Sequence, residues 1–212
     1  MSSTTVYPNG DGSKGSWAIF GGGTSNIYTV ISEGTASPND SDYIAGPFGA
    51  GNYFMLLGDM PADFGTATAV TFKIRAQYST SKGDNKSFNC RLYKSDESTV
   101  ITGTTNTSVS GSFSTYSISP SITGATDKTS WDGARLQVSP QAGSSSGSIF
   151  ISAVQVEITY TAAASGSLFT MSFLKGLAPC GPKNFNRLER CIPSLWIPRR
   201  PQILVPAMVV SA

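Results

Sequence analysis

An alternation of apolar and polar side chains over residues 69–78 constrains the fold more than any other feature of this 212-residue chain. The apolar positions are Val70, Phe72, Ile74, Ala76 and Tyr78. Because successive side chains of a strand point to opposite faces of a sheet, one face of this segment must meet a core and the other water. Residues 88–93 and 154–160 repeat the pattern, which places Cys90 on a core-facing position.

The composition agrees with a chain made of strands. Charged residues are 13% of the sequence, and 22 glycines accompany abundant Ser and Thr, which favours strands and tight turns over surface helices. Further strand candidates are residues 27–32, 53–57, 99–102, 113–119, 135–139 and 149–160. About eight short strands with no helical period between them predict an all-β fold, a jelly-roll-type two-sheet β-sandwich with an extended C-terminal arm.

Charge and proline content divide the chain near residue 167. Residues 1–167 hold nine Lys/Arg and twelve Asp/Glu, whereas residues 168–212 hold six Lys/Arg, one acidic residue and six of the twelve prolines. The predicted organisation is an N-terminal loop segment with one short strand (1–25), a β-sandwich domain (26–161), a linker (162–167) and a basic, proline-rich C-terminal arm (168–212).

The arm contains too many large apolar side chains to leave in water and too many prolines to form a second core. Either it covers the sandwich's own sheet, or it buries these side chains on another chain. We favour another chain, because proline-rich segments commonly act as recognition strands or tethers, and the apolar content makes nucleic acid a less suitable partner than protein. The expected contact residues are Phe185, Arg187, Arg190, Leu195, Trp196, Arg199, Arg200 and Leu204.

The sequence has no histidine, which excludes Ser-His-Asp and Cys-His catalysis and ordinary zinc sites. We therefore expect no catalytic residue, cofactor or metal site. A glycoside hydrolase that uses carboxylates alone is a minority alternative, with Glu33, Glu97 and Glu157 as its candidate residues. The chain has no window of about 18 apolar residues and no secretory signal at its start, so we expect neither a membrane segment nor export.

Acidic loop residues permit a binding site at one end of the sandwich. They can converge on a divalent cation or on sugar hydroxyls, although solvated turns are the favoured interpretation. The residues concerned are Asp40, Asp42, Asp59 and Asp63. Residues 9–15 resemble the start of a calcium loop but lack its later ligands, which favours a plain turn.

Aromatic and cysteine residues leave further alternatives open. A sugar platform or a sandwich core can use the same aromatic side chains, and we favour the core. These side chains are Trp17, Tyr28, Tyr43, Tyr53, Phe54 and Trp131. Cys180 and Cys191 can form a disulfide or remain free thiols.

One set of residues extends over most of the predicted sandwich. It comprises Trp17, Tyr43 with Ile44, residues 72–75, Trp131 with Leu136 and Val138, and residues 154–160. Together they resemble the lectin-like jelly-roll domains of structural proteins from tailed bacteriophages, without covering the arm. The resemblance implies a virion protein, either a capsid decoration (cement) protein or a neck or tail component, that commonly assembles as a symmetric oligomer.

The function expected from the arm and the resemblance is that of a non-enzymatic virion structural protein, anchored to neighbouring subunits by its C-terminal arm. Its expected partners are other virion proteins and copies of itself, and its expected location is the virion, assembled in the host cytoplasm. The alternative is a carbohydrate-binding module that recognises glycans through loops at one end of the sandwich.

Overall fold

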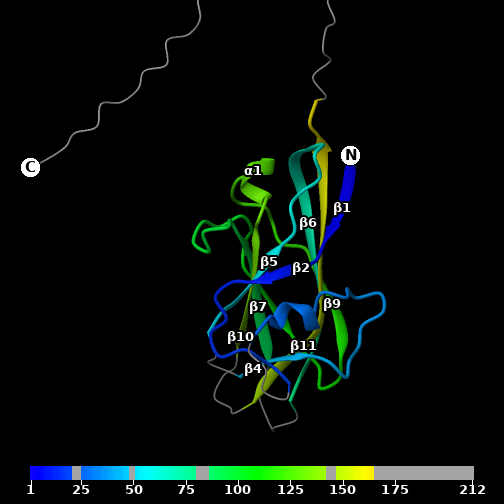
Figure 1. Ribbon diagram of the computed structural model, residues 1–212, viewed down its shortest axis with the longest axis vertical. Helices are drawn as coiled ribbons and strands as arrows, with labels where there is room; N and C mark the ends of the chain where they lie inside the picture. Colours follow the sequence, from blue (N-terminus) through cyan, green and yellow to red (C-terminus); the bar gives the residue numbers. More distant parts are fainter. Residues whose placement is uncertain (21–24, 48–50, 80–85, 142–146, 165–212) are drawn as a thin grey trace, which may run out of the picture. The chain divides into compact units, whose positions relative to one another are not determined.

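The computed structural model describes residues 1–20, 25–47, 51–79, 86–141 and 147–164. These residues form two antiparallel sheets, sheet A with six strands and sheet B with five (Figure 1). Across sheet A the order is β3 (Ala18–Ile19), β4 (Ile44–Pro47), β11 (Ser148–Ala162), β6 (Phe64–Tyr78) and β9 (Ser114–Ile118), and β1 (Ser2–Val6) also pairs with β11. Across sheet B it is β2 (Pro8–Asp11), β5 (Tyr53–Leu57), β10 (Arg135–Gln141), β7 (Ser87–Tyr93) and β8 (Thr105–Ser108).

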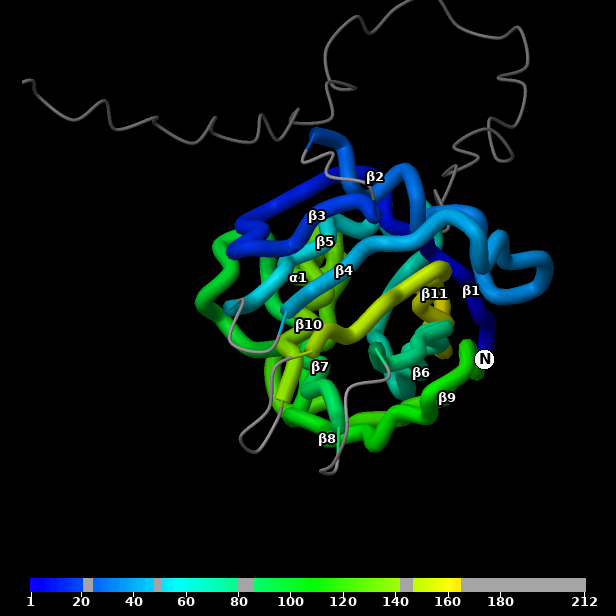
Figure 2. The backbone as a smooth tube through the Cα atoms, turned by 90° about the horizontal axis from the view of Figure 1, so that it is seen from below, coloured from blue at the N-terminus to red at the C-terminus, as the bar shows by residue number. Residues whose placement is uncertain are grey.

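The chain passes repeatedly from one sheet to the other. Strand β4 of sheet A is followed by β5 of sheet B, β6 of sheet A and then β7 and β8 of sheet B. The same exchange continues through β9, β10 and β11. In Figure 2 the view is along the strands, with β7 and β10 on one side and β6 and β11 on the other. This is the jelly-roll form of the β-sandwich, as the sequence predicts.

Strand β11 lies in the middle of sheet A. One edge pairs with β6 along most of its length, from Ile149 opposite Tyr78 to Ala162 opposite Phe64, with three shifts of register. The other edge is shared, because β4 pairs with residues 148–151 and β1 pairs with residues 156–160.

One core fills the space between the sheets. The largest fully buried side chains include Trp17, Trp131, Tyr53, Phe72 and Phe88. Cys90 is fully buried, as predicted, and burial raises the pKa of its thiol to about 11. Gly46 has no room for a side chain, because a Cβ there would lie 2.4 Å from the Trp17 indole.

Six of the eight predicted strands are present. They correspond to β5, β6, β7, β9, β10 and β11, and their bounds extend beyond the predicted ones in β6, β7, β10 and β11. The alternation that predicted β6 is also seen in its burial, because Phe72, Ile74 and Ala76 are buried and the residues between them are partly exposed.

The N-terminal segment contains more structure than predicted. Residues 1–25 were expected to hold one short strand, yet they form β1, β2 and β3. Strand β1 is largely polar and alternates exposed with partly buried side chains, ending at the buried Val6. Its strand conformation depends on pairing with β11, a contact between distant parts of the sequence that local pattern does not reveal.

The prediction of a strand at residues 27–32 is wrong, because Ile27–Val30 form a 3₁₀ helix. The Asp11 carboxylate accepts hydrogen bonds from the backbone N–H groups of Ile27 and Tyr28, at 3.0 and 2.9 Å. Asn26 precedes the helix in the left-handed region, with φ of 51°. An acceptor sixteen residues away therefore determines the turn.

The prediction of a strand at residues 99–102 is also wrong. Val100 and Thr102 form only isolated bridges, with Tyr93 and Ile122. The preceding turn is held by the Asp96 carboxylate. It accepts hydrogen bonds from the Thr99 hydroxyl and from the backbone N–H groups of Thr99 and Ser98, and these lower the pKa of Asp96. Strands β4 and β8, which no alternation indicated, complete the two sheets.

The only α-helix in the described part of the chain is α1 (Lys128–Trp131). Asp127 caps it by accepting a hydrogen bond from the Ser130 backbone N–H at 3.0 Å. Over the described ranges, no helix has the length and apolar character needed to cross a membrane.

Strand β11 ends at Ala162, inside the predicted linker. Half of that linker, residues 165–167, and the whole arm, 168–212, lie outside the described residues. The expected contact residues of the arm therefore remain predictions: Phe185, Arg187, Arg190, Leu195, Trp196, Arg199, Arg200 and Leu204.

Candidate functional site

The outward faces of the two sheets carry the polar side chains that a ligand can reach. On sheet A these come mainly from the outward positions of β6 and β11, between buried positions of the same strands. On sheet B they come mainly from β7 and β10, whose outward residues are partly exposed and alternate with buried ones. The two faces differ in how their charges are arranged.

On the outer face of sheet A each cation of β6 has a carboxylate partner. Lys73 Nζ lies 2.5 Å from Glu157 Oε1. Arg75 donates to Asp40 with two nitrogens, Nε at 2.7 Å and Nη2 at 2.5 Å, which is the bidentate geometry favoured by guanidinium and carboxylate.

Asp40 has a further donor, since the Ser152 hydroxyl donates to its Oδ1 at 2.8 Å. The hydrogen bond from Arg75 is the main cause that holds the pKa of Asp40 below its ordinary value, and the same contact raises the pKa of Arg75. Both groups are thus charged at neutral pH, and Arg75 donates its hydrogen bonds to Asp40.

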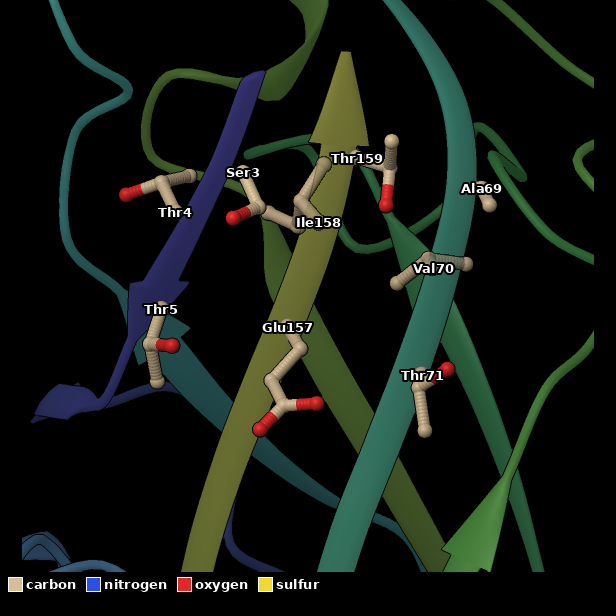
Figure 3. A pocket seen from close by; sticks show the side chains of 9 residues that line it. All are labelled: Ser3, Thr4, Thr5, Ala69, Val70, Thr71, Glu157, Ile158 and Thr159. Carbon is tan, nitrogen blue, oxygen red and sulfur yellow. The ribbon is translucent and has the colours of Figure 1, made fainter. Parts of the chain in front are cut away.

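A groove of about 320 Å³ lies on the outer face of sheet A, between β1, β11 and β6 (Figure 3). The side chains that line its outward side are mostly hydroxyls, from Ser3, Thr5, Thr71 and Thr159, together with the Glu157 carboxylate. Glu157 is neutralised by Lys73, and no aromatic residue lines this groove. It offers hydrogen bonds but neither a stacking surface nor an unpaired charge.

An aromatic cluster occupies another part of sheet A, next to β3 and β4. Phe20 stacks on Tyr43 with ring centroids 4.5 Å apart, and Tyr43 also contacts Phe150 at 4.9 Å and Phe113 at 5.7 Å. Phe20 is 61% exposed, whereas the other three rings are partly buried. Desolvation raises the pKa of Tyr43.

The outer face of sheet B carries an arginine without an acidic partner. Arg91 of β7 lies opposite Gln137 of β10, and Tyr93 lies opposite Arg135. We call these four residues the Arg91 block. No described carboxylate lies within 4 Å of Arg91, and its Nη1 donates only a long hydrogen bond of 3.5 Å to the Tyr93 hydroxyl. The guanidinium carbon lies 5.9 Å from the centre of the Tyr93 ring, within cation–π range.

Two buried guanidinium nitrogens of the Arg91 block have no acceptor. The Nε atoms of Arg91 and Arg135 are both buried without a hydrogen-bond partner. A buried donor without an acceptor costs about 1–3 kcal/mol, and such groups are uncommon in folded proteins. The outer face of sheet B therefore carries an energetic cost that the outer face of sheet A does not.

Arg135 differs from Arg91 because one of its terminal nitrogens has a partner. Its Nη1 lies 2.5 Å from Glu97 Oε1, and Glu97 also accepts from the backbone N–H of Ser13 at 3.1 Å. Gly12 lies against this ion pair, and a Cβ there would lie 2.3 Å from Glu97 and 2.5 Å from Arg135.

The acidic loop residues do not form a shared site. Asp40 pairs with Arg75, and Asp63 accepts a hydrogen bond of 3.2 Å from the Tyr160 hydroxyl. In the described parts of the chain, no group of three or more His, Cys, Asp or Glu residues is placed to hold a metal ion. Asp11, in the segment that resembles a calcium loop, accepts hydrogen bonds from the chain itself, including one of 2.7 Å from Tyr53 Oη.

The candidate aromatic and carboxylate residues are likewise spread over the fold. Three of the aromatic side chains, Trp17, Tyr53 and Trp131, lie in the core, which confirms the prediction for them. Phe54 is also buried, but it lies opposite Gln137 and packs against Tyr93 on the outer face of sheet B, so a core position is wrong for it. Tyr28 and Tyr43 are partly exposed. Glu33 accepts a hydrogen bond from the Asn39 backbone N–H, Glu97 pairs with Arg135, and Glu157 pairs with Lys73.

No protein-family model and no curated protein matches the chain. Two solved structures are similar to it in strand arrangement. One, titled "CBM4 structure and function", is 10% identical, has a TM-score of 0.40, and matches 68% of this chain and 94% of its own. The other is the enzymatically active domain of tailspike protein 4 from bacteriophage CBA120, which is 14% identical with a TM-score of 0.39; the match covers 74% of this chain and 19% of the tailspike chain. These similarities are coarse and concern the fold alone.

The Arg91 block was not among the candidate sites from sequence. Alternation in residues 88–93 does place Arg91 and Tyr93 on the polar face of their strand. It does not distinguish Arg91 from Arg75, because both occupy polar positions of alternating strands. Only the position of Asp40 beside Arg75 separates them.

Proposed function

We propose that the chain is a non-enzymatic virion structural protein, a capsid decoration or cement protein or a neck or tail component, attached to neighbouring subunits by residues 168–212. The sandwich serves as the body that faces outward, and the arm as the attachment. The partners are other virion proteins and further copies of the chain.

The supporting observation is that the sandwich buries its large apolar side chains in its own core. Among the described residues, only Met1, Tyr7 and Phe20 are large, apolar and exposed. The sandwich thus presents few apolar side chains to any other segment, while the arm has many to bury. A neighbouring subunit can supply the missing surface, with Trp196, Arg199 and Arg200 as the main contacts.

The positions of the glutamates support a non-enzymatic role. Hydrolysis of a glycosidic bond by carboxylates needs two of them on either side of one sugar, within about 10 Å of each other. Glu157 lies on sheet A and pairs with a lysine, whereas Glu97 pairs with an arginine of sheet B. Each of these two glutamates therefore already forms an ion pair within the chain.

Deletion of residues 168–212 tests the proposal. We expect the truncated protein to keep the circular dichroism of a β protein and to unfold cooperatively, but to be absent from purified particles assembled in its presence. A second variant tests the proposed contacts within the full chain. It carries Trp196→Ala, Arg199→Ala and Arg200→Ala, and we expect it to be incorporated poorly. Normal incorporation of the truncated protein would contradict the proposal.

Glycan binding is the second candidate, and the outer face of sheet B favours it. Arg91, Tyr93 and Gln137 offer a guanidinium, a phenol ring and an amide side by side on two neighbouring strands. Stacking on a ring and hydrogen bonds from planar polar groups are the interactions that suit a sugar. The expected end loops are less suitable, since Asp40 is occupied by Arg75. Measurable retardation of the full chain in native gels that contain a polysaccharide tests this candidate.

A further inference from the structure

The Arg91 block combines an unpaired cation with groups that can hold a sugar ring. No described carboxylate lies within 4 Å of the Arg91 guanidinium, and the hydrogen bond that its Nη1 donates to the Tyr93 hydroxyl is long, at 3.5 Å. Gln137, directly opposite on β10, makes no side-chain hydrogen bond within the described residues. Both side chains are partly exposed, so a ligand can approach them.

We propose that the Arg91 block binds the acidic group of a sugar, a carboxylate or a sulfate. This inference rests on the glycan-binding candidate and gives it a ligand class. The terminal nitrogens of a guanidinium form a planar fork that matches an anionic group with two or three oxygens. Gln137 bonds a neighbouring hydroxyl, and the Tyr93 ring lies beside the sugar, 5.4 Å from the Phe54 ring that supports it.

Charge distribution favours an acidic glycan over a nucleic acid. Residues 1–167 carry nine Lys/Arg against twelve Asp/Glu, so the sandwich as a whole repels a polyanion with closely spaced phosphates. Near the Arg91 block, the one other cation of the block, Arg135, is already paired with Glu97. One isolated cation suits a polymer whose charges are widely spaced and whose other groups are hydroxyls.

The test measures binding of the full chain to four polymers: polygalacturonate, dextran sulfate, neutral dextran and duplex DNA. We expect polygalacturonate or dextran sulfate to bind at least about tenfold more tightly than dextran and DNA, and Arg91→Met to weaken that binding at least about tenfold. The preference between the two acidic polymers identifies the anionic group. Arg91→Lys keeps the charge but loses the fork, and we expect an intermediate loss.

Two control variants separate the Arg91 block from other cations. Arg75→Met makes the same change in charge on the opposite sheet, and Arg199→Ala with Arg200→Ala removes two cations from the arm; we expect both to bind within about twofold of the unmodified chain. If Arg91→Met does not fold, Arg91→Lys carries the comparison.

Each remaining outcome overturns the proposal. Equal losses in Arg91→Met and Arg75→Met, or tighter binding to DNA than to the acidic polymers, would assign the effect to overall charge. Tight binding to dextran that is unaffected by Arg91→Met would retain the glycan-binding candidate and reject the acidic ligand. No binding to any of the polysaccharides would reject both.

Discussion

The outer faces of the two sheets use the same residue type in opposite ways. Arg75 on sheet A is held by Asp40 through two hydrogen bonds, whereas Arg91 on sheet B has a buried Nε with no acceptor. Sheet A satisfies its charges internally and gains stability from them. Sheet B leaves the Arg91 guanidinium without a described carboxylate, which is the arrangement expected of a surface whose partner is another molecule.

The inner faces of the sheets should show no such difference, because they share one core. Phe72 of sheet A and Leu136 of sheet B are both fully buried. We expect Phe72→Ala to lower the free energy of unfolding by about 3–5 kcal/mol and Leu136→Ala by about 2–5 kcal/mol. Urea denaturation checks this, and a loss below about 1 kcal/mol for either variant would mean that its sheet is not part of the common core.

The matched arginine substitutions should change stability in opposite directions. Arg75→Met leaves the Asp40 carboxylate with only the Ser152 hydroxyl, and because the pair is partly exposed we expect a loss of up to about 1 kcal/mol. Arg91→Met removes a buried donor without an acceptor and keeps the aliphatic packing, so we expect a change between zero and a gain of about 1 kcal/mol. Thermal unfolding of both variants measures the difference, and equal losses would remove the contrast between the faces.

The Asp40–Arg75 pair should also make stability depend on pH. The pKa of Asp40 is lowered in the folded protein, so its contribution is fully present above the unfolded pKa of about 3.9 and is lost as pH falls through the folded value. Because the pair is partly exposed, we expect the contribution to be below about 1 kcal/mol. Denaturation of the unmodified chain and of Asp40→Asn from about pH 6 down to pH 2 measures it, and a gap that widens on acidification would contradict the assignment.

The smallest effect is expected in the hydroxyl groove of sheet A. Thr71 and Ser119 share a hydrogen bond of 2.9 Å at an exposed position. We expect Thr71→Val to change the free energy of unfolding by less than about 0.5 kcal/mol and to leave polysaccharide binding unchanged. Loss of glycan binding in this variant would move the ligand site from sheet B to the groove of sheet A.

Sequence pattern predicts the parts of this fold whose structure depends on local alternation. Residues 69–78 became β6 because every second side chain enters the core. The polar strand β1 could not be predicted in this way, since its conformation depends on a pairing with β11 more than 150 residues away. Local pattern also failed at the 3₁₀ helix that begins at Ile27, because the acceptor of its first backbone N–H groups is Asp11, sixteen residues away.

The candidate site shows the same limit. Alternation correctly placed both Arg75 and Arg91 at outward positions, but it carried no information about which of them has a carboxylate neighbour. That neighbour comes from a loop 35 residues before Arg75 in the chain. A binding surface defined by a missing partner can only be recognised once the positions of all the possible partners are known.

The most direct test of the contrast between the two faces is the ¹H–¹⁵N spectrum of the arginine Nε–H groups, recorded while an acidic oligosaccharide is added. We expect the Arg91 signal to move with saturation and the Arg75 signal to stay in place, since its Nε already donates to Asp40. A saturating shift of Arg75 without one of Arg91 would contradict the account.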